Sequence, residues 1–163
     1  ERIKTLYKLT VNKKNKYILL TSVNAIIQKV IDEKIINDNF IFININKEYN
    51  FKTLIFKLIE LGYQRRSVVR EKTEFSIRGS IIDIYLAENI NPIRLDFFNN
   101  KIESIKEFNS LTQKTLKKSY IKNILIHPSC EILLTDKTIG LFRENFKSYG
   151  KEVEYLLNSG PII

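Results

Sequence analysis

The hydrophobic and polar positions of the chain follow three successive patterns. In the first, residues 17–20 form a short apolar run, apolar side chains recur at helical spacing over 26–31, and residues 40–45 are mostly β-branched or aromatic. A strand, a helix and a second strand in that order predict a βαβ-like unit at the edge of a parallel sheet. The hydroxyl of Thr21 or Ser22 can cap this helix by accepting a hydrogen bond from a backbone amide.

The second pattern opens with a helix that we expect within residues 46–62. Its apolar side chains share one face: Leu54, Ile55, Leu58, Ile59 and Leu61. Asn50 is placed to cap the first turn, and Gly62 is placed to end the helix in the left-handed conformation that glycine adopts easily.

Short β-rich segments then follow one another without intervening helices. We expect these strands at approximately 67–70, 75–85, 93–98 and 102–108. Turn residues punctuate them at Gly79, 89–92 and 99–100. Such close spacing predicts an antiparallel meander. The helix and the meander together form a small α+β module.

The third pattern begins with a strand at 121–126, which Pro128 closes, and then becomes helical. Thr135 or Asp136 is the expected cap, and a last helical stretch is expected at 152–157. The apolar face of the main helix is expected to hold Ile139, Leu141, Phe142 and Phe146.

The three patterns predict an α/β plus α+β chain. Residues 1–46 are interpreted as the end of an α/β domain, and residues 47–128 as an inserted helix-and-meander module. Residues 129–163 are interpreted as a helical segment that returns to the first domain.

Composition narrows the class of protein. The chain has 163 residues, of which 44% are hydrophobic and 28% charged, as in an ordinary globular domain. No apolar run approaches the roughly 18–20 residues of a transmembrane helix. One Cys excludes an internal disulfide, fits a reducing compartment and, with one His, excludes a Cys/His zinc site. Because the chain contains no Met, we expect it to be a piece of a longer protein.

The net charge of +9 has two interpretations. It can attract nucleic acid or an acidic protein. It can also reflect an A/T-rich gene, because Ile, Lys and Asn together make up 63 residues and no basic run of five exists. The arginines are more specific: there are 7 against 20 lysines, which suggests that each retained guanidinium fork is needed.

The sequence offers no pattern for catalysis. It contains neither a phosphate-binding P-loop nor a Gly-x-Gly-x-x-Gly motif. His127 has no evident partner for a general base and is expected to be structural or on the surface, and Cys130 is expected to be a small buried side chain. The acids Asp83, Asp96 and Glu103 show no metal-ligand spacing. We therefore expect no enzyme activity and no cofactor in this part of the protein.

The segment 93–98 combines side chains that are typical of protein interfaces. With a period of two, one face holds Ile93, Leu95 and Phe97, and the other holds Arg94, Asp96 and Phe98. Arginine and aromatic residues are common interface anchors. Arg78, beside Gly79 on the preceding strand, is a further candidate. Two alternatives to an interface role remain for these residues. In one, Arg94 and Asp96 form an ordinary solvated ion pair. In the other, Phe98 belongs to a hydrophobic core.

These residues lie in blocks whose order resembles the UvrB-homology region of bacterial transcription-repair coupling factors, the Mfd family. The resemblance as a whole covers about residues 16–148, including the upstream segment from Ile18 to Val30 and the helix with Leu141-Phe142-Arg143. Its most specific blocks are Leu61-Gly62-Tyr63, Glu74 to Tyr85, Pro92 to Phe98, Ile102 to Ile105, Phe108, Thr112-Gln113 and Ile126-His127-Pro128.

The resemblance implies a docking role. In this family, the region corresponding to 46–128 docks UvrA, and the region before it is a degenerate RecA-like domain without a working ATPase. The family residues that face UvrA fall on Arg78, Arg94 and Phe98, and Asp96 is expected to share the role.

The resemblance also implies a larger parent protein in the bacterial cytoplasm. Its separate carboxy-terminal motor uses ATP and Mg to move on double-stranded DNA and displaces RNA polymerase stalled at a lesion, so that nucleotide excision repair can begin. The family further suggests that a carboxy-terminal domain masks the docking face.

Three sites depart from the family pattern: two single residues and one turn. Thr73 stands where the family usually has Gly, Leu86 where it has Pro, and 99–101 replace a turn that is often acidic. Two alternative functions stay open: a fragment of the excision-repair subunit UvrB, which would need an ATP-binding loop upstream, and a basic module for single-stranded nucleic acid.

Overall fold

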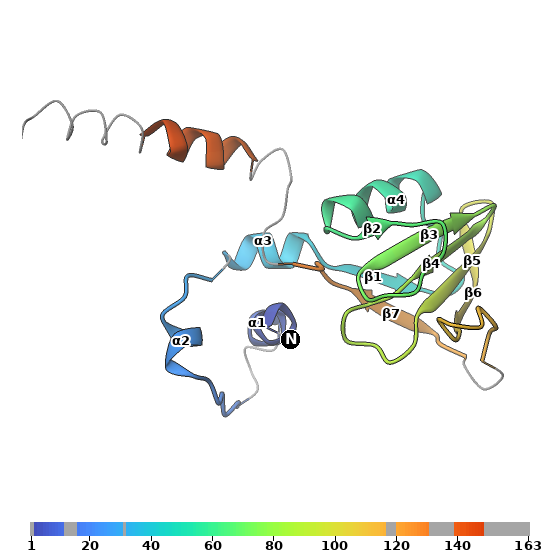
Figure 1. Cartoon of the computed structure of the whole chain (residues 1–163), viewed down its shortest axis with the longest axis horizontal. Coiled ribbons are helices and arrows are strands. Elements are labelled where there is room, and N and C mark those ends of the chain that lie inside the picture. Colours follow the sequence, from blue (N-terminus) through green and yellow to red (C-terminus); the bar gives the residue numbers. More distant parts are fainter. Residues whose placement is uncertain (1, 12–15, 31, 117–119, 131–138, 149–163) are drawn as a thin grey trace, which may run out of the picture. The chain divides into compact units, whose positions relative to one another are not determined.

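The structure, a computed structural model, describes residues 2–11, 16–30, 32–116, 120–130 and 139–148 (Figure 1). The chain divides into two compact units, residues 1–131 and 132–163. In the second unit, residues 139–148 are helical as expected, and the rings of Phe142 and Phe146 stack with their centroids 6.0 Å apart. The expected cap at 135–136 and the helix at 152–157 lie outside the described residues.

The first unit contains two sheets within its described residues. In order along the chain, its elements are α1 (Arg2–Val11), α2 (Val23–Ile26), α3 (Glu33–Asp38), β1 (Ile41–Asn44), α4 (Phe51–Glu60), β2 (Gln64–Arg65), β3 (Glu74–Arg78), β4 (Ile81–Ile84), β5 (Ile93–Phe98), β6 (Lys101–Glu107) and β7 (Asn123–Ile126). The larger sheet has the order β2-β3-β4-β5-β6, antiparallel from β3 to β6. The predicted meander is therefore confirmed, with β2 added parallel to β3.

Helix α4 begins and ends where the sequence predicts. The side chain of Asn50 accepts a hydrogen bond from the Thr53 amide at 3.0 Å. At the other end, Gly62 has φ +84°, and its amide donates to the Ile59 carbonyl while the Tyr63 amide donates to Leu58. This pair of bonds is a Schellman motif, which requires a left-handed residue at the glycine position.

One face of the larger sheet packs against α4, β1 and β7 and forms the hydrophobic core. Its fully buried members include Leu58 from α4 and Ile43 and Ile126 from the smaller sheet. The sheet contributes Phe75, Ile82, Ile84, Ile93, Leu95, Phe97, Ile102 and Ile105. The alternation of 93–98 thus correctly predicts which side chains of β5 are buried.

Strands β1 and β7 bring the two ends of the module together. They are antiparallel, with Ile41 opposite Ile126 and Asn44 opposite Asn123, and Figure 1 shows them side by side. After β1 the chain follows the outer edge of β6, where the Asn46 amide donates to the Ile102 carbonyl at 2.8 Å. Residues 45–122 therefore leave and return through one pair of strands.

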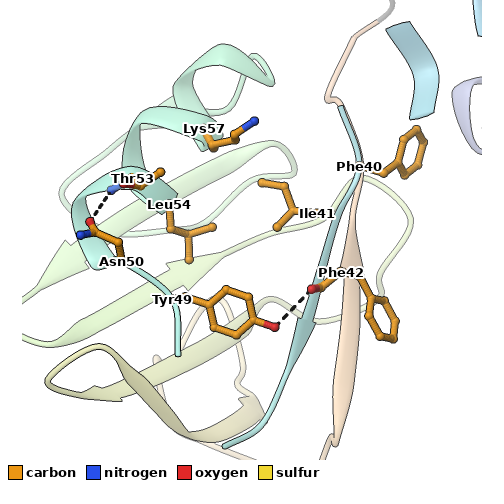
Figure 2. Close-up of a pocket in the computed structure, with 8 residues that line it drawn as sticks. All are labelled: Phe40, Ile41, Phe42, Tyr49, Asn50, Thr53, Leu54 and Lys57. Carbon is orange, nitrogen blue, oxygen red and sulfur yellow. Dashed lines mark hydrogen bonds between the residues drawn. The ribbon is translucent and has the colours of Figure 1, made fainter. Parts of the chain in front are cut away.

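The free edge of β1 is covered by a side chain. The Tyr49 hydroxyl accepts a hydrogen bond from the Asn44 amide at 2.9 Å. It also donates to the Phe42 carbonyl at 3.3 Å, and Figure 2 shows this second bond. These are the backbone groups that a third strand would use. A cavity of about 300 Å³ remains beside them, between β1 and α4, with Leu54 and Lys57 among its lining residues.

The predicted βαβ unit at the beginning of the chain is wrong. Residues 40–45 do contain strand β1, but its neighbour is the antiparallel β7. Residues 17–20 form no strand, and Ile18 is 93% exposed. An apolar run becomes a strand only where a neighbour accepts and donates its backbone hydrogen bonds, and no described segment does so here. The helix after it is shorter than expected, although Ser22 caps α2.

Two strand predictions in the meander need correction. Residues 67–70 are a loop, and the short strand β2 lies just before them. The run 75–85 is two strands, because the chain turns at Gly79, where φ is +59°, and Ser80. The strand expected at 121–126 is confirmed as β7.

The backbone of Thr73, which stands where the family usually has Gly, is strained. It has φ +68°, a left-handed conformation that is rare for a β-branched residue. Its backbone is held from both sides, because its amide donates to the Tyr85 carbonyl at 2.8 Å and its carbonyl accepts from the Gln64 amide at 2.9 Å. The chain cannot relax without breaking these bonds.

We predict that Thr73→Gly stabilises the protein. Removing the Cβ relieves the left-handed strain, and the net gain in the free energy of unfolding should be about 0.5–1 kcal/mol after the added entropy of the unfolded chain. Thr73→Ala is the control and should bring no comparable gain, because it keeps a Cβ. Urea denaturation measures both, and a less stable glycine variant would contradict the prediction.

Candidate functional site

The predicted docking residues lie on the face of the larger sheet that points away from α4, here called the outer face. Strand register arranges it in rows. One row holds Ser76, Asp83, Arg94 and Lys106, and the next holds Arg78, Ile81, Asp96 and Ser104. Phe98 follows at the end of β5. The structure therefore brings Arg78, Arg94, Asp96 and Phe98 to one face.

The centre of the outer face is an ion-pair cluster built on Asp83. Its carboxylate is completely buried and accepts from Arg94 in a bidentate arrangement, Nε to Oδ1 at 2.7 Å and Nη2 to Oδ2 at 3.0 Å. Arg78 Nη2 donates to the same Oδ2 at 2.6 Å. The ion pair of Arg94 is thus with Asp83 on the neighbouring strand, not with Asp96 on its own strand.

Two loops cover part of the outer face around Arg94. The guanidinium of Arg94 lies over the ring of Phe108, 4.5 Å from its centroid. Gln113 Nε2 donates to the Val69 carbonyl at 3.0 Å and to the Ser110 carbonyl at 2.6 Å, which joins loop 109–116 to loop 66–72. Val69 and Phe108 are fully buried as a result. The outer face has a small core of its own.

The four candidate residues differ in how much surface they offer. The ring of Phe98 is prominent, because the residue is 64% exposed. The Arg78 side chain is 45% exposed, whereas that of Arg94 is only 17% exposed. Asp96 is half-buried. The alternative in which Phe98 belongs to a core is therefore wrong.

Glu74 folds loop 66–72 back onto the sheet. One carboxylate oxygen accepts from the amides of Arg70 and Glu71, both at 2.9 Å, and the other accepts from Arg66 Nε at 3.2 Å. Burial alone would raise the pKa of this carboxyl, but the two backbone donors and Arg66 outweigh it and leave the pKa of Glu74 below its ordinary value.

His127 is a buried, structural residue. Its Nδ1 lies 2.9 Å from the Pro128 carbonyl and its Nε2 lies 3.4 Å from a carboxylate oxygen of Glu88. The Tyr63 hydroxyl donates to the His127 carbonyl at 3.0 Å. Burial, and then the charge of Glu88, raises the pKa of Tyr63 far above its usual range, so this hydroxyl remains a donor. Sequence reasoning missed Glu88 as a neighbour, and the expectation that Cys130 is buried is wrong, since it is exposed.

The described residues show neither a metal-binding cluster nor a membrane-spanning helix. Among them, no three His, Cys, Asp or Glu side chains gather into a group that could hold a metal ion. None of the helices in the same residues has both the length and the apolar character to cross a bilayer.

We predict that Glu74 contributes stability that depends on pH. Because its folded-state pKa is lowered, the contribution is present above the unfolded-state pKa of about 4.3 and disappears as pH falls through the folded-state pKa. Glu74→Gln should lower the free energy of unfolding by about 1–2 kcal/mol at pH 7. The difference from the wild type should shrink in acid. Denaturation at several pH values measures this, with the exposed Glu103→Gln as control; a pH-independent difference would contradict it.

Comparisons with known proteins identify relatives over most of the chain. The family described as the UvrB interaction domain matches residues 41–131. The transcription-repair-coupling factor of Borreliella burgdorferi is 38% identical over 159 residues, which is 96% of this chain and 14% of that protein. Proteins of the same name from Myxococcus xanthus and Staphylococcus haemolyticus are 31% and 30% identical over 74% and 91% of this chain.

These matches coincide with the module defined by the fold. The matched range 41–131 begins at β1 and ends just beyond β7, so it contains the whole larger sheet and the outer face. The chain spans only 10% to 14% of the length of these three relatives. The chain belongs to the UvrB interaction domain family, and the relatives named here are transcription-repair coupling factors.

Proposed function

We propose that this chain is a non-catalytic module through which a transcription-repair coupling factor docks UvrA. The observation that carries the proposal is the composition of the outer face. Arg78 on β3 and Arg94, Asp96 and Phe98 on β5 lie on this one face, with β4 between the two strands, and Phe98 is largely exposed. An exposed aromatic ring beside oriented arginines is the usual core of a protein interface.

The fold supports a binding role for this face. The sheet buries its other face against α4, so the outer face is the side available to a partner. Asp83 and Phe108 hold Arg94 in one place before any partner arrives. A preorganised face loses less side-chain entropy on binding than a mobile one.

In the proposed parent protein, other regions supply the motor. It is an ATP-dependent DNA translocase of the bacterial cytoplasm that uses ATP and Mg, binds double-stranded DNA and displaces stalled RNA polymerase. Residues before β1 belong to the end of a degenerate RecA-like domain of that parent. A carboxy-terminal domain of the parent covers the docking face until UvrA is recruited. In this scheme residues 47–128 form the docking module and need no cofactor.

We predict that Phe98→Ala weakens binding of the chain to UvrA by about 2 kcal/mol, as loss of an interface anchor does. The free energy of unfolding should not change, because the ring is exposed. Phe56→Ala is a matched control: Phe56 is 67% exposed but lies on α4, across the core. Calorimetric titration of the wild type and both variants with UvrA measures the difference.

Equal affinities for the wild type and Phe98→Ala would contradict the proposal. A parallel titration with single-stranded oligonucleotide at two salt concentrations tests the alternative. Tight binding that weakens steeply with salt would favour a nucleic-acid-binding module instead.

A further inference from the structure

We propose that Asp83 is the positioning residue of the docking face, and that Arg94 acts on the partner only through it. Arg78 is then the arginine that contacts UvrA. This inference rests on the proposed function. It assigns different roles to Arg78 and Arg94, which the resemblance treats alike, and adds Asp83, to which the resemblance gives no role.

The carboxylate of Asp83 depends on both arginines. It is fully buried in the sheet, and its two oxygens accept three hydrogen bonds from the two guanidinium groups. A buried carboxylate without partners is strongly unfavourable, so each guanidinium is drawn to a fixed position. The bidentate geometry fixes the plane of Arg94 as well as its distance.

Arg94 has little left to offer a partner. Its Nε and Nη2 are bound to Asp83, and its Nη1 lies 3.5 Å from the Thr115 hydroxyl. The Phe108 ring covers one side of its guanidinium plane. With only 17% of its side chain exposed, Arg94 serves to hold the Asp83 carboxylate in a fixed orientation.

Arg78, by contrast, uses few of its donors on Asp83 and exposes much of its side chain. Only its Nη2 is bound to Asp83, and nearly half of its side chain is exposed. An arginine has five N–H donors, so Nε and Nη1 can still address an acceptor on a partner. Two guanidinium groups around one carboxylate also leave one net positive charge. The partner surface that fits it is therefore acidic.

The test is a double-mutant cycle on UvrA affinity, with Arg78→Ala, Asp83→Asn and the double variant. We expect Asp83→Asn to weaken binding about tenfold, because it removes charged hydrogen bonds that hold Arg78. In the Arg78→Ala background, Asp83→Asn should have almost no effect on UvrA affinity, because the guanidinium group that Asp83 orients is absent. Glu60→Gln, the same chemical change at an exposed position of α4, is the control and should leave affinity unchanged.

A second variant covers the case in which Asp83→Asn does not fold. Arg94→Lys keeps the positive charge beside Asp83 but loses the fork, and its effect should likewise vanish when Arg78 is Ala. Losses that add in the double variants, or unchanged affinity of the folded single variants, would overturn the positioning role while leaving UvrA docking intact. Failure of the wild-type chain to bind UvrA would overturn the docking proposal itself and this inference with it.

Discussion

The fold depends on covering one apolar face of a five-stranded sheet that is too small to bury itself. Helix α4 covers part of that face, and the β1–β7 pair covers the rest. Helix α4 and β1 come from the beginning of the module and β7 from its end, so the helix, the sheet and both connecting strands share one core. Leu58 and Ile126 are far apart in the chain, yet both are fully buried in this single core.

The outer face of the larger sheet is organised by charge pairing around Asp83 rather than by apolar burial alone. A central sheet position would normally hold an apolar side chain or face water, but Asp83 does neither. Its charge is neutralised by arginines from the two strands that flank it, and Asp83 itself is shielded from water while Arg78 stays partly exposed. Phe98, two residues beyond Asp96 along β5, lies outside this cluster.

Local rules predicted the elements whose stability is local. The cap at Asn50, the end at Gly62 and the alternation of β5 depend on neighbouring residues and match the structure. The pairing of β1 with β7 joins segments about 80 residues apart, and periodicity carries no information about such a partner. For the same reason, residues 17–20 looked like a buried strand when read alone.

The candidate site likewise has features that the local sequence predicts and features that it does not. The alternation placed Arg94, Asp96 and Phe98 together, but not the partner of Arg94. The tight turn at Gly79 and Ser80 pairs Arg78 with Ile81, so Asp83 could be placed opposite Ser76 by counting. The register of β4 against β5 could not be counted, because an eight-residue connection separates Ile84 from Ile93. The role of Asp83 therefore became visible only in the structure.

The β1–β7 pair has a consequence for how this module can be exchanged between proteins. Ile41 and Ile126, the outermost pair of these strands, face each other across one strand spacing, a separation of about 5 Å. A host domain therefore needs to open a surface loop only by that distance to accept residues 41–126. Insertions succeed where the ends of the insert are close together and at the surface. The module can thus be acquired, lost or transplanted as a cassette without stretching the protein that carries it.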